Sequence, residues 1–157
     1  MTTIMYDRQA GIMAADSRAY SGSTTPIGEK RKIFRLGDGA LVGVSSTVVG
    51  FSTMFLPWLE AGADPLAAPN YLRPIDRGDA TFDALMVSPK GDVFMFINQW
   101  VATGPLDGDV FAIGTGAEYA LGAFWAGGGI GMAMRIACEL DIWSAPPIVT
   151  LAREPGR

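Results

Sequence analysis

Short stretches of alternating apolar and polar residues dominate the first third of the chain. Residues 2–7 and 12–16 are two such stretches, and the turn-forming residues Gln9-Ala10-Gly11 lie between them, so the pattern predicts a β-hairpin at the amino terminus. Residues 32–36 alternate like a half-buried strand, and the apolar run at residues 40–45 predicts a strand buried on both faces. We therefore expect a sheet of short, mainly antiparallel strands.

A helical period replaces this alternation in the next segment. Apolar residues recur every three or four positions from Val48 to Leu59, which predicts a helix over residues 48–61. Pro57 lies inside this helix and is expected to weaken or kink it, because proline cannot donate the backbone hydrogen bond of a helix interior.

The rest of the chain repeats the order of strands followed by helices. Residues 82–88 and 93–98 predict a second hairpin around the turn at residues 89–92. We further expect residues 100–104 to continue the sheet, a strand at 110–113, helices at 117–126 and 131–140 joined by a glycine run, a closing strand at 148–151, and irregular structure at 21–26, 63–79 and 152–157. Strands grouped apart from helices predict a layered α+β fold and argue against a parallel βαβ fold.

Size and composition are those of one globular domain covering residues 1–157. Hydrophobic residues make up 49% of the chain and charged residues 18%, which excludes a disordered or fibrous protein. The mean hydropathy of +0.25 is high for a small soluble monomer, so we expect a layered core and a homo-oligomer that buries further apolar surface. The weakly polar stretch 120–138 is a poor transmembrane span because glycines and Arg135 interrupt it, and no signal peptide is evident, which predicts a cytoplasmic protein.

Charge and residue usage exclude several classes of function. The net charge of −4 argues against a nucleic-acid partner, since phosphate binding needs a basic surface. The lone Cys138 lies on a predicted helix and is interpreted as a buried small hydrophobe. The chain contains no histidine, which excludes Ser-His-Asp and Cys-His catalysis and removes the commonest zinc ligand; we expect no cofactor. A hydrolase of this composition would need a lysine, a carboxylate or an amine as its base.

Thr2 offers such a base. Methionine before a small residue is readily removed, and loss of Met1 would leave threonine at the amino terminus. Its α-amine, with an ordinary pKa of about 7.7–8.0, can take the proton of its own hydroxyl directly or through a water, so that nucleophile and base lie on one residue. A threonine at position two has no such meaning by itself, so the interpretation depends on the surrounding sequence.

Five segments of that sequence resemble, in order and roughly in spacing, the proteasome β-subunits and HslV-type peptidases. They are Thr2-Thr3-Ile4, Ala15-Asp16-Ser17-Arg18-Ala19, Lys32-Ile33-Phe34-Arg35-Leu36, Ala112-Ile113-Gly114-Thr115-Gly116 and Asp141-Ile142-Trp143-Ser144. The resemblance implies a four-layer αββα sandwich and an N-terminal threonine nucleophile that hydrolyses amide bonds in polypeptides. It further implies that Thr2 is this nucleophile and that Asp16 and Lys32 are the buried acid and lysine beside it. Physically, a lysine cation lowers the pKa of a nearby hydroxyl, and a carboxylate keeps the buried lysine charged.

The resemblance assigns roles to further residues. Gly43 matches the glycine whose N–H stabilises the oxyanion; it is equally well interpreted as a packing glycine, and the N–H of Val44 is an alternative donor. Thr115 stands where the family has serine, close to the nucleophile. Asp141 and Ser144 match a loop that supports the threonine amine, or else they end a helix before Pro146. The Gly114-Thr115-Gly116 turn also resembles part of a dinucleotide site, but the third glycine is missing because position 119 is tyrosine.

The chain is shorter than typical family members. Only one good helix fits between residues 48 and 82, where the family has two, and the glycine connection at residues 127–131 is abbreviated. These helices form ring and unfoldase contacts in the family, so a ring of fixed size or an ATPase partner does not follow from the resemblance. The alternative to a peptidase is a catalytically inactive protein of the proteasome fold that assembles or acts as a scaffold.

Overall fold

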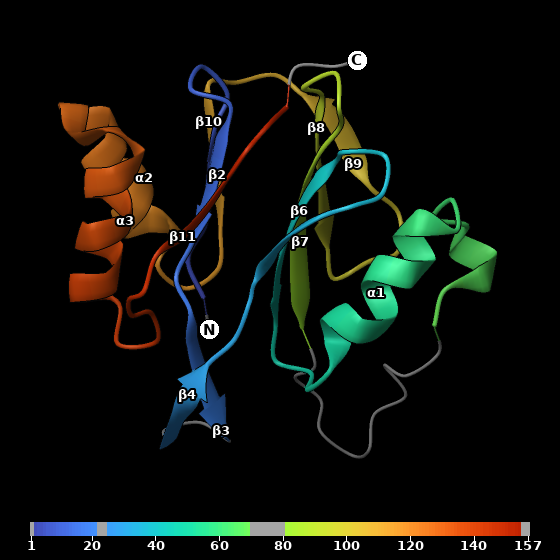
Figure 1. The fold of residues 1–157 in the computed structure, drawn as a ribbon, viewed down its shortest axis with the longest axis horizontal. Coiled ribbons are helices and arrows are strands. Elements are labelled where there is room, and N and C mark those ends of the chain that lie inside the picture. The colour runs from blue at the N-terminus through green and yellow to red at the C-terminus, as the bar shows by residue number, and fades with distance from the viewer. Residues whose placement is uncertain (1, 22–24, 70–80, 155–157) are drawn as a thin grey trace.

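Two antiparallel sheets packed face to face form the centre of the molecule (Figure 1). The computed structural model describes residues 2–21, 25–69 and 81–154. Sheet I has the strand order β10-β1-β2-β11, and sheet II has the order β5-β6-β7-β8-β9. Their strands are β1 (Ile4–Asp7), β2 (Ile12–Ala15), β10 (Val110–Ile113) and β11 (Val149–Ala152) in sheet I, and β5 (Ile33–Arg35), β6 (Leu41–Ser46), β7 (Phe82–Val87), β8 (Val93–Ile97) and β9 (Thr103–Leu106) in sheet II.

Helices cover the outer face of each sheet. The α2 helix (Ala117–Ala123), the π-helical turn η2 (Phe124–Gly128) and α3 (Gly129–Leu140) lie on sheet I, whereas α1 (Phe51–Glu60) lies on sheet II (Figure 1). A short 3₁₀ turn, η1 (Pro65–Ala67), follows α1. The order helix, sheet, sheet, helix confirms the predicted α+β fold with four αββα layers.

The alternation read from the sequence explains how the layers pack. Residues of one parity on β1, β2, β6 and β7 meet between the sheets, where Ile4, Tyr6, Met13, Leu41 and Leu85 are buried. Residues of the other parity face the helices: Met5 and Ala14 pack against α3, and Val42 and Ala84 pack against α1. Each sheet is therefore buried on both faces, as the apolar run at residues 40–45 predicted.

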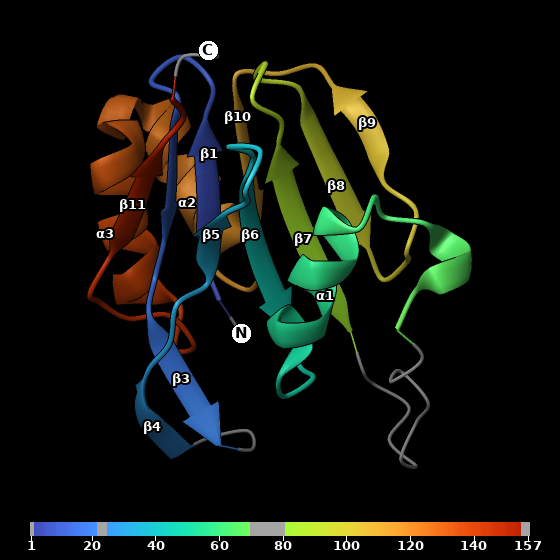
Figure 2. The ribbon, with the colours of Figure 1, turned by 45° about the vertical axis from the view of Figure 1, so that its right-hand side comes forward.

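Several boundaries differ from the predictions. The expected loop at residues 21–26 is in part a hairpin, because β3 (Arg18–Ser21) pairs with β4 (Thr25–Glu29), and this hairpin projects beyond the sheets (Figure 2). The sequence did not reveal it, since every residue of β4 is exposed and lacks the apolar alternation of a half-buried strand. Helix α1 begins three residues later than predicted, after Gly50 with a φ of 75°. Of the irregular segment 63–79, residues 70–79 lie outside the described residues.

The apolar segment Ala117–Leu140 is long and apolar enough, by length and composition alone, to cross a membrane. In the structure it is not one straight helix. Gly127, with a φ of 95°, interrupts it, and α2 and α3 pack side by side on sheet I (Figure 1). The glycine run thus acts as the predicted connection between two helices.

The two sheets approach each other closely at Gly43. A Cβ at this position would lie 2.6 Å from Cγ2 of Ile4, closer than side-chain contacts in proteins permit. Gly43 therefore lets β6 and β1 pack directly. Since β1 begins at the end of the molecule where β6 ends (Figure 2), this contact also sets where Thr2 lies relative to sheet II.

We expect Gly43→Ala to lower the free energy of unfolding by about 1–3 kcal/mol, because the added methyl overpacks the space that Ile4 fills. The matched control is Gly122→Ala in α2, where an added Cβ meets no atom within 4 Å; it should be neutral or raise stability by about 0.4–1 kcal/mol. Urea denaturation of both variants tests this. Equal free energies of unfolding for the two variants would mean that β6 and β1 can move apart at Gly43 without a loss of stability.

Candidate active site

Thr2 and Thr3 lie buried at the start of β1, at the end of the gap between the sheets. The adjacent β2 fixes this segment: the Asp16 N–H donates to the Thr3 carbonyl at 3.1 Å, and the Thr3 N–H donates to Oδ1 of Asp16 at 2.9 Å. Thr2 lies two residues before Ile4, and the pairing of β1 with β2 continues to Thr3, whose carbonyl accepts from the Asp16 N–H, so the Thr2 side chain belongs to the face that meets sheet II. The Thr3 side chain belongs to the opposite face.

Asp16 is the centre of the site. Its Oδ1 accepts from the Lys32 ammonium at 2.7 Å as well as from Thr3, and its Oδ2 accepts from the N–H groups of Arg18 and Ala145, each at 3.1 Å. Both side chains of the Asp16–Lys32 pair are completely buried. The predicted acid and lysine are thus in direct contact, and one carboxylate links them to the Thr2–Thr3 peptide.

Burial lowers the pKa of Lys32 from its usual value, since removing water disfavours the cation. The negative charge of Asp16 and its hydrogen bond oppose this shift, and the nearby charge of Lys30 adds to it. A lysine in this situation exerts a strong field on neighbouring hydroxyl and amine groups, because little solvent screens it. It also releases a proton more easily than a surface lysine.

A second carboxylate approaches the backbone nitrogen of Thr2 from the other side. The Thr2 N–H donates to Oγ1 of Thr115 at 3.3 Å, and the Thr115 hydroxyl donates to Oδ2 of Asp141 at 2.7 Å. Ser144 also donates to Oδ2 of Asp141, at 2.6 Å, and its Oγ lies 2.7 Å from Oγ1 of Thr3. Asp141 therefore contacts the Thr2 nitrogen through Thr115, and Ser144 contacts Thr3.

Sequence reasoning did not single out Thr3 as part of this network. Its buried hydroxyl joins Ser144 to β1, and its N–H joins β1 to Asp16. The available signal was its position beside Thr2 on a strand, where neighbouring side chains point to opposite faces. Two consecutive threonines can therefore face two different polar clusters.

The glycines on each side of Thr115 allow this close approach. A Cβ on Gly114 would collide with the carbonyl of Thr2, and a Cβ on Gly116 would collide with the hydroxyl of Thr3. Gly114 also has a φ of 93°, which other residues rarely adopt. Because Thr2 and Thr3 fill the space at this turn, it is not an open cradle for a nucleotide phosphate.

Gly43 does not bring its N–H to this cluster. Thr47 donates to the Thr81 carbonyl at 3.0 Å, so the odd-numbered residues of β6, Gly43 among them, direct their N–H groups toward β7. The alternative donor, Val44, donates its N–H to the Lys32 carbonyl at 2.9 Å. The geometry thus fits the packing interpretation of Gly43, and both N–H groups are engaged within the sheet.

The backbone N–H of Arg18 donates to Oδ2 of Asp16, and its guanidinium lies 3.4 Å from the Tyr20 hydroxyl. Among the residues that the structure describes, no group of three or more histidine, cysteine, aspartate or glutamate side chains could hold a metal ion.

Replacing the central carboxylate should destabilise the whole fold. Asp16→Asn leaves the Lys32 cation buried without its counter-ion, and breaking such a pair costs about 3–5 kcal/mol. Urea denaturation against Asp107→Asn provides the control, because Asp107 forms an exposed pair with Arg8 and its loss should change little. Similar stabilities for the two variants would contradict the central role of Asp16.

Cys138 on α3 lies near the charges of Asp16 and Lys32, and its thiol should react slowly with alkylating reagents. Burial, and after it the negative charge of Asp16, raises the pKa of its thiol to about 11. At pH 9 only about one thiol in a hundred would then be the reactive thiolate. We expect alkylation by iodoacetamide, followed by mass spectrometry, to stay slow up to pH 9 in the folded protein and to be fast in urea. Equally fast labelling of both states would contradict this.

Comparison with solved structures places the whole chain on a known fold. BPH of Thiobacillus denitrificans, solved in complex with epoxomicin, matches with a TM-score of 0.68 and 18% sequence identity, over 98% of this chain and 100% of that one. Eukaryotic HslV from Trypanosoma brucei also matches with a TM-score of 0.68 and 18% identity, over 96% of this chain and 99% of that one. No protein-family model matches the sequence. The chain therefore has the proteasome-like fold of HslV, which confirms the fold that the sequence resemblance implied.

Proposed function

We propose that this protein is a threonine peptidase that cleaves polypeptide amide bonds with Thr2 after Met1 has been removed. The observation that carries the proposal is the buried Asp16 carboxylate, which binds both the Thr3 N–H and the Lys32 ammonium, at 2.9 and 2.7 Å. A buried ion pair beside a threonine at the chain terminus is costly to maintain for stability alone. It suits a site in which a hydroxyl must be made nucleophilic without histidine.

In this mechanism the Thr2 hydroxyl attacks the scissile carbonyl while its proton passes to the Thr2 α-amine. The resulting tetrahedral oxyanion collapses to an ester, and the ammonium gives its proton to the departing amine of the substrate. Water then hydrolyses the ester and restores the free hydroxyl. Lys32 and Asp16 supply the electrostatic field, and Thr115, bound to Asp141, orients the amine.

Ser46 is our candidate for the oxyanion donor. In antiparallel pairing the N–H groups of even-numbered β6 residues point toward β5, as that of Val44 does. The hydrogen bonding between β5 and β6 does not reach Ser46. The residue that would pair with Ser46 in this register is Lys30, but β5 begins only at Ile33, and the Lys30 N–H donates to the Ser17 carbonyl instead. The Ser46 N–H therefore points to a free edge of sheet II, at the end of β6 that lies beside the start of β1 (Figure 2).

We further propose that copies of this chain assemble in the cytoplasm and that an ATPase unfoldase is a partner of the assembly. Helices α2 and α3 carry exposed apolar side chains on the outside of sheet I, among them Tyr119, Trp125 and Met132, with Trp125 66% exposed. Apolar side chains gathered in this way favour contacts with other proteins.

Thr2→Ala should lower kcat/KM for peptide hydrolysis by at least about a thousandfold, since it removes the nucleophilic hydroxyl while the α-amine remains. Lys32→Met should cause a similar loss, because it removes the cation and keeps the stem. Thr2→Ser retains the hydroxyl and is the matched control, expected to keep measurable activity. The assay uses protein whose intact mass proves the loss of Met1, and circular dichroism verifies that each variant folds.

Covalent labelling provides a second readout. Processed protein should gain the mass of one epoxomicin molecule at Thr2, and the Thr2→Ala variant should not. Retained Met1 together with no labelling would overturn the peptidase and favour the inactive scaffold protein. Undiminished activity in Thr2→Ala would show that another residue is the nucleophile.

A further inference from the structure

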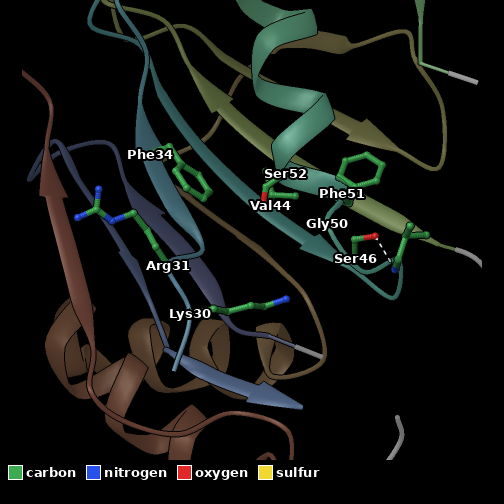
Figure 3. A pocket seen from close by; sticks show the side chains of 9 residues that line it. Lys30, Arg31, Phe34, Val44, Ser46, Gly50, Phe51 and Ser52 are labelled. Carbon is green, nitrogen blue, oxygen red and sulfur yellow. Dashed lines mark hydrogen bonds between the residues drawn. The ribbon is translucent and has the colours of Figure 1, made fainter. Parts of the chain in front are cut away.

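A pocket of about 210 Å³ opens beside the candidate site, on the face of sheet II that α1 covers. Its apolar walls come from Phe34, Val44 and Phe51, and Ser46 and Ser52 add hydroxyl groups (Figure 3). The volume is below the range of about 300–1,000 Å³ that is usual for whole small-molecule ligands. It suits a single side chain of a larger substrate.

The free edge of β6 connects this pocket with the reaction. A peptide whose carbonyl accepts from the Ser46 N–H would lie opposite Ser46 as an added antiparallel strand. Residues directly opposite each other in such a pair direct their side chains to the same face of the sheet. Because Ser46 lines the pocket, the substrate residue that donates the scissile carbonyl would place its side chain there.

The charge at the pocket is positive. Lys30 lines the pocket, and its side chain extends across the lower end toward the side of Ser46, whereas the Arg31 side chain points away (Figure 3). None of the described residues that line the pocket carries a carboxylate, and Lys30 takes part in none of the ion pairs found in the described part of the chain. Asp83, on the neighbouring strand, is in register with Ser45 and so belongs to the opposite face.

The start of α1 adds to this positive field. Gly50, Phe51 and Ser52 line the pocket, and they form the amino-terminal end of the helix. No side chain caps this end, and its first turn contains no acidic residue. The amino-terminal end of a helix carries a partial positive charge from the helix dipole, which favours a nearby negative charge.

We propose that this pocket receives the side chain immediately before the scissile bond and that Lys30 makes it select glutamate or aspartate. The inference rests on the proposed peptidase function, since it takes Thr2 as the nucleophile. The apolar walls would hold the methylene groups of the acidic side chain, and its carboxylate would lie at the mouth beside Lys30. An arginine or lysine side chain would be repelled there.

The test uses the full chain after removal of Met1 and four fluorogenic peptides that differ only in the residue before the cleaved bond: Glu, Gln, Leu and Arg. We expect kcat/KM for Glu to exceed that for Gln by roughly 1.5-fold to fivefold, as for an exposed ion pair, and to exceed that for Arg by more. Lys30→Glu should bring the Glu to Gln ratio to one or below. Lys90→Glu, the same charge change in the β7–β8 turn, should leave the ratio unchanged. Equal rates for Glu and Gln, a higher rate for Leu than for Glu, or a ratio insensitive to Lys30→Glu would overturn the assignment.

A binding measurement separates this inference from the proposed function. Fluorescence polarisation would compare Glu and Gln forms of one labelled peptide on the Thr2→Ala protein and on its Lys30→Glu derivative. Tighter binding of the Glu form that depends on Lys30, with no hydrolysis by the protein bearing Thr2, would sustain the pocket and overturn the peptidase. Hydrolysis without charge preference would sustain the peptidase and overturn the pocket assignment.

Discussion

The structure depends on the buried carboxylate of Asp16. Its two oxygens accept from four donors that belong to separate parts of the chain: the start of β1, the turn into β3, the segment before β5 and the loop before β11. A charge without solvent around it requires such partners, because each missing hydrogen bond would leave a large desolvation cost uncompensated. The contact that joins these segments also binds the Lys32 ammonium and the Thr3 N–H to one carboxylate, so the fold and the candidate site share one interaction.

Much of this arrangement could be predicted from the sequence. The alternation at residues 2–7 and 40–45 identified the strands, and the resemblance selected Thr2, Asp16, Lys32 and Thr115, which the structure brings into one hydrogen-bonded region. The proposed oxyanion donor, Ser46, could not be predicted in the same way. Neighbouring N–H groups on a strand point in opposite directions, so a shift of one residue changes which of Gly43, Val44 and Ser46 faces the free edge. Only the register of β5 with β6 decides this.

Lys30 and Lys32 show why residue type alone does not assign a role. They stand two positions apart, yet Lys32 is buried against Asp16 and Lys30 is exposed at a pocket. The difference arises because the Lys32 carbonyl still accepts from the Val44 N–H of β6, whereas the Lys30 N–H donates to Ser17, so the chain leaves sheet II between the two lysines. The exposed β3–β4 hairpin was missed for a related reason: its residues face solvent, and burial imposed no pattern on them.

The two glycines around Thr115 have a consequence for how the protein would mature. Gly114 lies directly against the carbonyl of Thr2, and Gly116 lies against the hydroxyl of Thr3, which also contacts Ser144. These contacts are all made by residues that follow Thr2 in the chain. The position of the threonine is thus set independently of what precedes it. Removal of Met1 would convert the amide nitrogen of Thr2 into a free amine without changing the contacts that hold Thr2 and Thr3. In the proposed peptidase, removal of Met1 would therefore need no conformational rearrangement of the described residues.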